Sequence, residues 1–70
     1  MQLKDLYQTI KKYNLPVKIN IDTNNGIVSK YFADWNTTST RKYDNLLVIS
    51  SYLAPTPAHA LYIAIDLLGD

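Results

Sequence analysis

The sequence predicts an α+β domain of 70 residues: a two-layer sandwich in the order α-β-β-β-α, with a three-stranded antiparallel sheet and both helices on one face. Three observations support this. Apolar residues recur at helical spacing over 2–14, apolar and polar residues alternate over 17–22, and capping residues flank the apolar segment 57–68. No linker, repeat or low-complexity tract divides the chain, so we expect a single domain over 1–70.

The first element is an amphipathic helix over 2–14. Its apolar face consists of Leu3, Leu6, Tyr7 and Ile10. Asn14 is suited to the C-terminal end of the helix, and Pro16 prevents its continuation.

A β-hairpin follows, in which Val17, Ile19 and Ile21 share one face of the first strand and Thr23-Asn24-Asn25-Gly26 supplies the turn. A two-residue Asn25-Gly26 turn would place on the core face Val28, Lys30, Phe32 and Asp34. A three-residue loop with Gly26 in a left-handed bulge would instead place there Ile27, Ser29, Tyr31, Ala33 and Trp35. The second set is mostly apolar and carries no charge, so it is the expected register. The outer face of this strand then has Phe32, with Lys18, Lys30 and Asp34 beside it.

Residues 36–42 form a polar loop, and the apolar run 46–53 predicts a strand buried for much of its length. A second helix is expected over 57–68, with Thr56 as the N-cap and Gly69 just beyond its end. Only a narrow stripe of that helix is polar, formed by His59, Tyr62 and Asp66. So wide an apolar face has to be covered on more than one side, either by the first helix or by a second chain.

The composition excludes several kinds of site. Without cysteine, neither a disulfide nor a cysteine-based zinc site can form, and two glycines cannot build a phosphate-binding loop. On the predicted helix His59 and Asp66 would stand about 10 Å apart along the axis, too far to pair. We therefore expect no catalytic residues, no metal and no cofactor. The sequence shows no signal peptide and no span of about 20 apolar residues, so the expected location is the cytoplasm, without a membrane.

Aromatic residues are the feature that points to a function, because six tyrosines, Trp35 and Phe32 exceed what a small core holds. Tyrosine, tryptophan and arginine dominate binding hot spots. The predicted protein-contact residues are Tyr31, Phe32, Trp35, Arg41, Lys42 and Tyr43. One alternative is a nucleic-acid-binding module that uses Lys11, Lys12, Lys18, Lys30, Arg41 and Lys42, although the net charge of +1 argues against it. Another alternative is a structural homodimer joined through 57–68 or through the sheet.

Two resemblances bear on these alternatives. The order α-β-β-β-α resembles the topology of the double-stranded RNA-binding domain. That family has a Lys-Lys-x-Ala-Lys cluster where this chain has Pro57-Ala58-His59-Ala60-Leu61, so the RNA function is not carried over.

The ending Thr56-Pro57-Ala58-His59-Ala60-Leu61-Tyr62-Ile63-Ala64-Ile65-Asp66-Leu67 resembles that of the small phage and prophage α/β-sandwich domains of the phage ABA sandwich type. The first helix and the strand after it have similar lengths there. The resemblance implies a phage or mobile-element accessory protein. With the surplus aromatics, it predicts a non-enzymatic protein that binds and modulates or inhibits a bacterial host protein. The predicted inhibition includes antidefence activity, in which the host protein belongs to a defence system, as for an anti-CRISPR.

Overall fold

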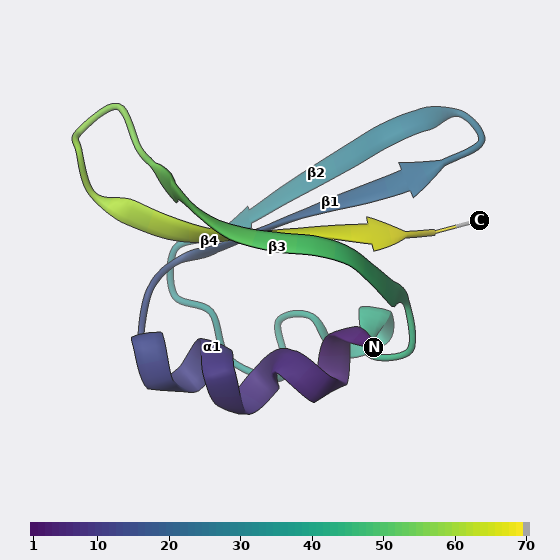
Figure 1. The fold of residues 1–70 in the computed structure, drawn as a ribbon, viewed down its shortest axis with the longest axis horizontal. Coiled ribbons are helices and arrows are strands. Elements are labelled where there is room, and N and C mark those ends of the chain that lie inside the picture. The colour runs from purple at the N-terminus through teal and green to yellow at the C-terminus, as the bar shows by residue number, and fades with distance from the viewer. Residues whose placement is uncertain (70) are drawn as a thin grey trace.

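The chain folds into one helix and a four-stranded mixed sheet in the computed structural model, which describes residues 1–69 (Figure 1). The elements are a 3-10 turn η1 (Leu3–Leu6), α1 (Tyr7–Tyr13), β1 (Val17–Thr23), β2 (Gly26–Phe32), a short 3-10 turn η2 (Arg41–Tyr43), β3 (Leu47–Pro55) and β4 (Leu61–Leu68). The strand order is β2-β1-β4-β3. The two central strands, β1 and β4, are parallel, and each pairs antiparallel with an edge strand.

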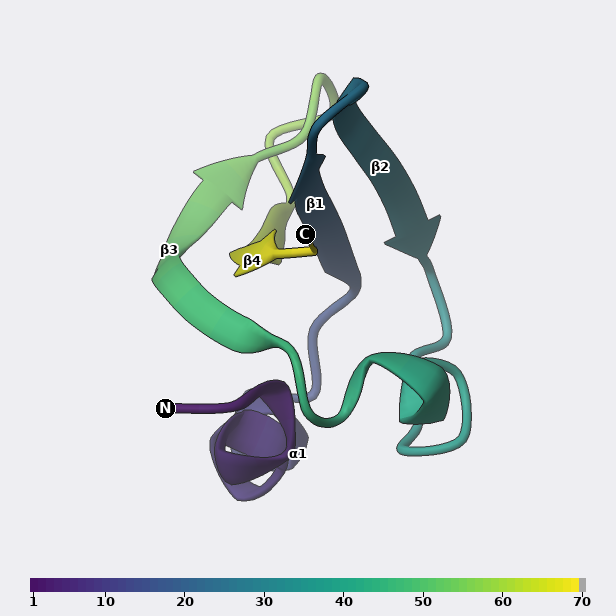
Figure 2. The ribbon, with the colours of Figure 1, turned by 90° about the vertical axis from the view of Figure 1, so that its right-hand side faces the viewer.

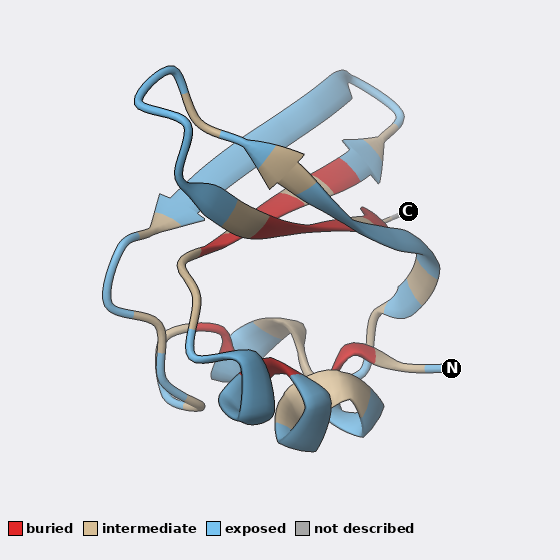
Figure 3. Ribbon diagram, turned by 60° about the vertical axis from the view of Figure 1, so that its left-hand side comes forward, coloured by how far each residue is buried: buried red, intermediate tan, exposed pale blue. Residues whose placement is uncertain are grey.

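Only one face of the sheet is covered. Helix α1 lies beneath it beside the loop that carries η2 (Figure 2), and no other element of residues 1–69 packs on the opposite face. Buried segments lie on both layers, in the central strands and in the helix (Figure 3), and the core consists of Leu3, Ile10, Val17, Ile19, Ile21, Ile63, Ile65 and Leu67. Most of these side chains come from the two central strands, because a central strand is shielded on both edges. None of the helices within residues 1–69 is long and apolar enough to cross a membrane.

The predicted first helix and first strand are confirmed. Leu3 and Ile10 are buried, and Leu6 and Tyr7 pack against the core. Asn14 ends α1 in the left-handed conformation, with φ of 53°, and its N–H donates to the carbonyl of Ile10 at 3.2 Å. The side chains of β1 alternate between the core and the opposite face as the pattern predicts.

The predicted hairpin register is wrong by one residue. Thr23 pairs with Gly26, so Asn24 and Asn25 form the turn, and Gly26, with φ of 113°, opens β2. The Thr23 hydroxyl fixes this turn by donating to the Gly26 carbonyl at 2.7 Å and accepting from the Asn25 N–H at 3.2 Å.

The register places a different set of β2 side chains on the core side: Val28, Lys30 and Phe32. The expected register disfavours this face because its set includes two charged residues, Lys30 and Asp34, and fewer apolar ones. On an edge strand, however, a lysine can extend past the core into water, and Lys30 is exposed. The expected outward position of Phe32 is therefore also wrong, since its ring packs against the core.

The predicted second helix is a loop followed by a central strand. Thr56 caps the loop 56–60 instead of a helix: its Oγ1 accepts from the Ala60 N–H at 3.1 Å and its carbonyl from the His59 N–H at 2.9 Å. His59 has φ of 65°, which turns the chain back. Residues 61–68 then alternate, with Ile63, Ile65 and Leu67 toward the core. Turn and helix caps use the same Thr-Pro chemistry, so the capping signal did not distinguish them.

These findings correct the predicted architecture. The class α+β is right, but the sheet has four strands and is mixed, and there is one α-helix instead of two. The wide apolar face expected of 57–68 is divided between the two faces of β4: Ile63, Ile65 and Leu67 point into the core, and Ala64 and Leu68 lie on the opposite face of the sheet. The strand predicted at 46–53 exists as β3, but it is an edge strand and is largely exposed. The loop predicted at 36–42 leads into η2 and contains the buried Thr40.

Candidate functional site

The sheet face opposite α1, which we name the open face, carries a hydrogen-bonded row with one residue from each strand. Ser29 Oγ donates to Asn20 Oδ1 at 2.7 Å, and Asn20 Nδ2 donates to Asp66 Oδ1 at 3.0 Å. Ser50 Oγ donates to the other carboxylate oxygen of Asp66 at 2.8 Å. The four residues are cross-strand partners in the order Ser29, Asn20, Asp66, Ser50. The row fixes these side chains in place, and each oxygen of the Asp66 carboxylate accepts a hydrogen bond.

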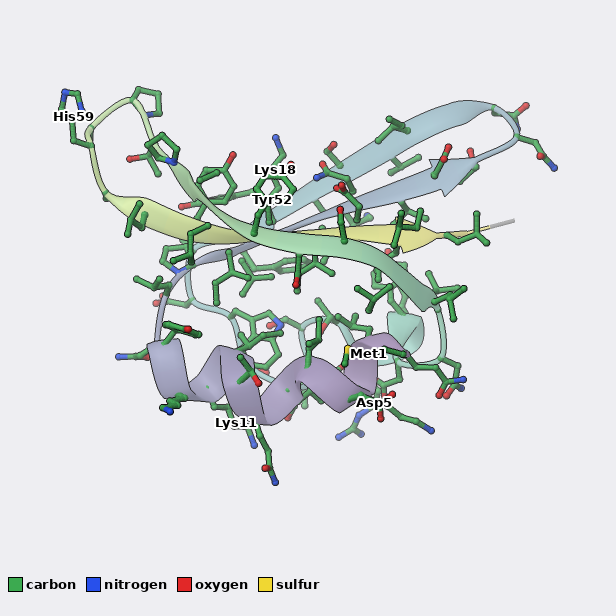
Figure 4. All side chains as sticks on the ribbon, in the orientation of Figure 1. Met1, Asp5, Lys11, Lys18, Tyr52 and His59 are labelled. Carbon is green, nitrogen blue, oxygen red and sulfur yellow. The ribbon has the colours of Figure 1, made fainter. Side chains whose placement is uncertain are left out.

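One side of this polar row is aromatic. Lys18 pairs with Tyr31 on β2 and with Ala64 on β4, and Ala64 pairs with Tyr52 on β3. Figure 4 shows Lys18 and Tyr52 on the side of the sheet away from α1. The rings of Tyr31 and Tyr62 meet edge to face with their centroids 6.0 Å apart. Ala64 is only 1% exposed although it lies on the open face, because its methyl group is short and larger side chains surround it.

A hollow of about 450 Å³ lies at the aromatic end of the open face. Its walls come from β1, β2, the end of β3, the start of β4 and the connection between the last two strands, and its lining consists of Lys18, Tyr31, Pro55, Thr56, Pro57 and Tyr62. The aromatic end is therefore concave, and a lysine ammonium group is its only charged group.

The other side of the polar row is aliphatic. Ile27 is 70% exposed and Ile49 is 55% exposed, and Leu47 on β3 lies opposite Leu68 on β4 at this end. A second hollow of about 490 Å³ reaches from here across the polar row, lined by Asn20, Asp22, Ile27, Ser29, Ile49, Tyr52 and Asp66. The open face is thus aromatic at one end, polar in the middle and aliphatic at the other end.

A separate polar cluster lies in the opposite layer and is closed to solvent at its centre. Thr40 is fully buried, and its Oγ1 accepts from Trp35 Nε1 at 3.1 Å and lies 3.2 Å from the Tyr7 hydroxyl. The Tyr7 hydroxyl also donates to the carboxylate of Asp44. The rings of Tyr7 and Trp35 stand 5.4 Å apart. These contacts fasten the loop 33–46 to α1, which is a structural role.

Because of this cluster, we expect the stability of the fold to decrease at alkaline pH. Burial raises the pKa of the Tyr7 phenol above 10.0, and its hydrogen bond to Asp44 acts in the same direction. Above pH 10 the unfolded chain releases this proton while the folded chain retains it. Stability contributed by Tyr7 is therefore present below that pH and is lost as the pH rises through the folded pKa.

We expect the urea midpoint of the wild type to fall more steeply above pH 10 than that of Tyr7→Phe, which has no phenol to titrate at this position. Urea titrations of both proteins from pH 8 to pH 11 measure the difference. Parallel curves would show that Tyr7 ionises alike in the folded and unfolded states.

The structure distributes the six predicted contact residues over both layers. Tyr31 lies on the open face, whereas Phe32, Trp35 and Tyr43 are half-buried against the core on the other side. Arg41 and Lys42 are exposed on η2, and Lys42 Nζ lies 5.2 Å from the centroid of the Tyr43 ring. The six residues do not form one surface, and of the six only Tyr31 belongs to the open face.

The basic residues of the nucleic-acid alternative are also dispersed. Lys11 and Lys12 are exposed on α1, and Figure 4 shows Lys11 on the helix side away from the sheet. Lys18 lies on the open face, while Lys30 belongs to the opposite face of β2. In the described part of the chain, no three His, Cys, Asp or Glu side chains gather where they could hold a metal ion.

Sequence reasoning missed most of the open face: Asn20, Ser29, Ser50, Tyr52, Tyr62 and Asp66. The missed signal is the alternation of Ile63, Ile65 and Leu67 with Tyr62, Ala64 and Asp66, which is typical of a strand with two different faces. A strand over 61–68 would have placed Asp66 and Tyr62 on one side of the sheet. Comparison of the chain with protein-family models, with curated proteins and with solved structures finds no match.

Proposed function

We propose that the chain is a non-enzymatic binding module that recognises a bacterial host protein through the open face. The observation that carries the proposal is that the open face combines exposed aromatic and aliphatic side chains with a fixed polar row, and no element of residues 1–69 covers it. Contiguous apolar surface of this kind marks interaction sites in small proteins. Tyrosine is among the residues that contribute most to binding energy.

The polar row supports a protein partner in a second way. Its side chains are held by one another before any partner binds, so little conformational entropy is lost at the centre of the contact. A partner that offers donors to Asp66 and apolar groups to either side matches the whole face. The two hollows give that partner places for protruding side chains.

The host setting of the proposal rests on the resemblance of residues 56–67 to the phage ABA sandwich proteins. In the structure this segment is the loop 56–60 and most of β4, so it shapes the aromatic end of the open face. Inhibition of a host protein, including a defence protein, is the role we propose for such a module.

The test compares two double variants of the full chain in capture from bacterial lysate, followed by titration with the captured protein in purified form. Ile49→Ala with Tyr52→Ala removes two half-exposed side chains from the open face. Arg41→Ala with Lys42→Ala removes two exposed side chains from the opposite layer and serves as the matched control. We expect the open-face variant to bind at least about 30-fold more weakly and the control to bind within about threefold of the wild type.

Circular dichroism of both variants establishes that they remain folded. Loss of binding in the control with retention in the open-face variant would contradict the proposal. Capture of nucleic acid in place of a protein would also contradict it, and binding would then weaken steeply with salt.

A further inference from the structure

The two edges of the sheet are unequal. The outer edge of β3 is obstructed: Gln2 bridges to Leu47, the Val48 N–H donates to the Met1 carbonyl at 2.8 Å, and a bulge interrupts the strand between Val48 and Ser50. Pro55 ends it. Strand β2 pairs regularly along its whole length and contains neither a bulge nor a proline. Bulges, prolines and covering segments are common protections of an edge strand, and β2 has none of these; its protection is a single lysine, Lys30, on the core side.

The backbone groups on the free edge of β2 can be identified from β1. The carbonyls of Pro16 and Asp22 accept from the N–H groups of Ile63 and Gly69. The backbone N–H and C=O groups of the even-numbered residues of β1 therefore point toward β4. The direction of these backbone groups alternates along a strand, so those of the odd-numbered residues of β1 point toward β2. There they form hydrogen-bonded pairs with Val28, Lys30 and Phe32. The groups that point away from the sheet therefore belong to Ile27, Ser29 and Tyr31. Within residues 1–69, none of the backbone–backbone hydrogen bonds outside the strand ladders involves these groups.

We propose that a second copy of this chain pairs antiparallel with β2 about a two-fold axis at Ser29. Backbone groups that point outward in one copy can form hydrogen bonds only with outward-pointing groups of the other copy. A two-fold axis that pairs Ile27, Ser29 and Tyr31 among themselves must therefore pass through Val28, Ser29 or Lys30. An axis at Lys30 sets two lysine side chains directly opposite each other, which is unfavourable. An axis at Val28 pairs Ile27 only with Ser29 and leaves Tyr31 opposite the turn. The axis at Ser29 uses all three residues and forms about six backbone hydrogen bonds.

The side chains fit this register. Ile27 lies opposite Tyr31 of the second copy, on the open face, and Val28 lies opposite Lys30 on the other face. Aromatic and β-branched residues are a favourable cross-strand pair, and no like charges meet. The axis is perpendicular to the sheet, so the two open faces join on one side as a continuous surface. The dimer is independent of the proposed function, which can hold for one copy or for two.

The first test measures the mass in solution by light scattering over a dilution series. We expect the wild type to reach twice the monomer's 8.0 kDa. Ser29→Pro removes an outward N–H without breaking the β1–β2 ladder, so it is expected to stay at 8.0 kDa. Ser29→Ala loses the same hydroxyl contact with Asn20 but keeps the N–H, so it is expected to dimerise like the wild type.

The second test does not depend on how well the proline variant folds. Ser29→Cys places a single thiol on the axis of a chain that has no cysteine. Residues opposite each other in a hydrogen-bonded pair have Cα atoms about 5.5 Å apart, within the range that a disulfide spans. Mild oxidation is expected to cross-link this variant selectively, whereas Ser51→Cys on β3 is expected to form no cross-link. A wild type that is monomeric throughout, equal cross-linking of both variants, or a dimer that survives Ser29→Pro would each overturn the proposal.

Discussion

Replacement of Leu67 by alanine is expected to lower the free energy of unfolding by about 2–5 kcal/mol. The same replacement at the adjacent Leu68 is expected to lower it by less than about 1 kcal/mol. Leu67 is fully buried in the core beneath β4, whereas Leu68 is 43% exposed on the open face. Urea denaturation of the two variants and the wild type measures the difference.

The expected loss at Leu67→Ala is large relative to the total free energy of unfolding of the domain. A domain of this length has a total stability of roughly 4–10 kcal/mol. If Leu67→Ala proves to be unfolded, Ile65→Val tests the same packing with an expected loss of about 0.5–1.5 kcal/mol. Equal losses at Leu67 and Leu68 would contradict the assignment of the two faces of β4.

Replacement of Thr40 by valine is expected to cost about 1–3 kcal/mol, because it leaves the Trp35 N–H without its acceptor and removes a hydrogen-bond partner of the Tyr7 hydroxyl. Valine has nearly the shape of threonine, so the change removes the hydroxyl group and little packing. The Trp35 N–H would lose its acceptor at 3.1 Å, and the Tyr7 hydroxyl would keep only its contacts with Asp44 and the Thr40 carbonyl. Thr40→Ser retains the oxygen and is the matched control, with a smaller expected loss.

Trp35 is the only tryptophan, so its fluorescence reports on this cluster directly. We expect the emission of Thr40→Val to differ from that of the wild type in the folded state, and that of Thr40→Ser to match it. Thr38→Val, at an exposed position of the same loop, is expected to change stability by no more than about 0.5 kcal/mol. Equal stability of Thr40→Val and the wild type would show that the hydroxyl does not hold the loop to α1.

The first half of the fold could be predicted from local pattern. The face of α1, its end at Asn14 and the alternation of β1 all follow from spacing and capping within a few residues. The second half depends on contacts between distant residues. Residues 57–68 carry helix-capping signals at both ends, and only their position between β1 and β3 makes them a strand. The β-branched Ile63 and Ile65 and their period of two were the local evidence for that outcome.

The sequence predicted the type of residue exposed on the binding surface but not which residues form it. The surplus of tyrosines indicated exposed aromatic rings, and Tyr31, Tyr52 and the half-buried Tyr62 lie together on the open face. The hairpin register decided which residues accompany them, and the charge of Lys30 was a poor guide to it because an edge strand tolerates a lysine on its inner side. The polar row joins residues from positions 20, 29, 50 and 66, so it becomes apparent only when all four strands are placed.

That one face of the sheet is open follows from residues 61–68 being a central strand instead of a second helix. Nuclear magnetic resonance of the labelled chain tests this most directly, through secondary chemical shifts and contacts between backbone protons of β1 and β4. We expect extended-strand shifts over Leu61–Leu68, contacts in the parallel register that pairs Val17 with Ile63 and Ile19 with Ile65, and slow amide exchange in both strands. Helical shifts over 57–68 without contacts to β1 would contradict the architecture, the open face and the function proposed for it.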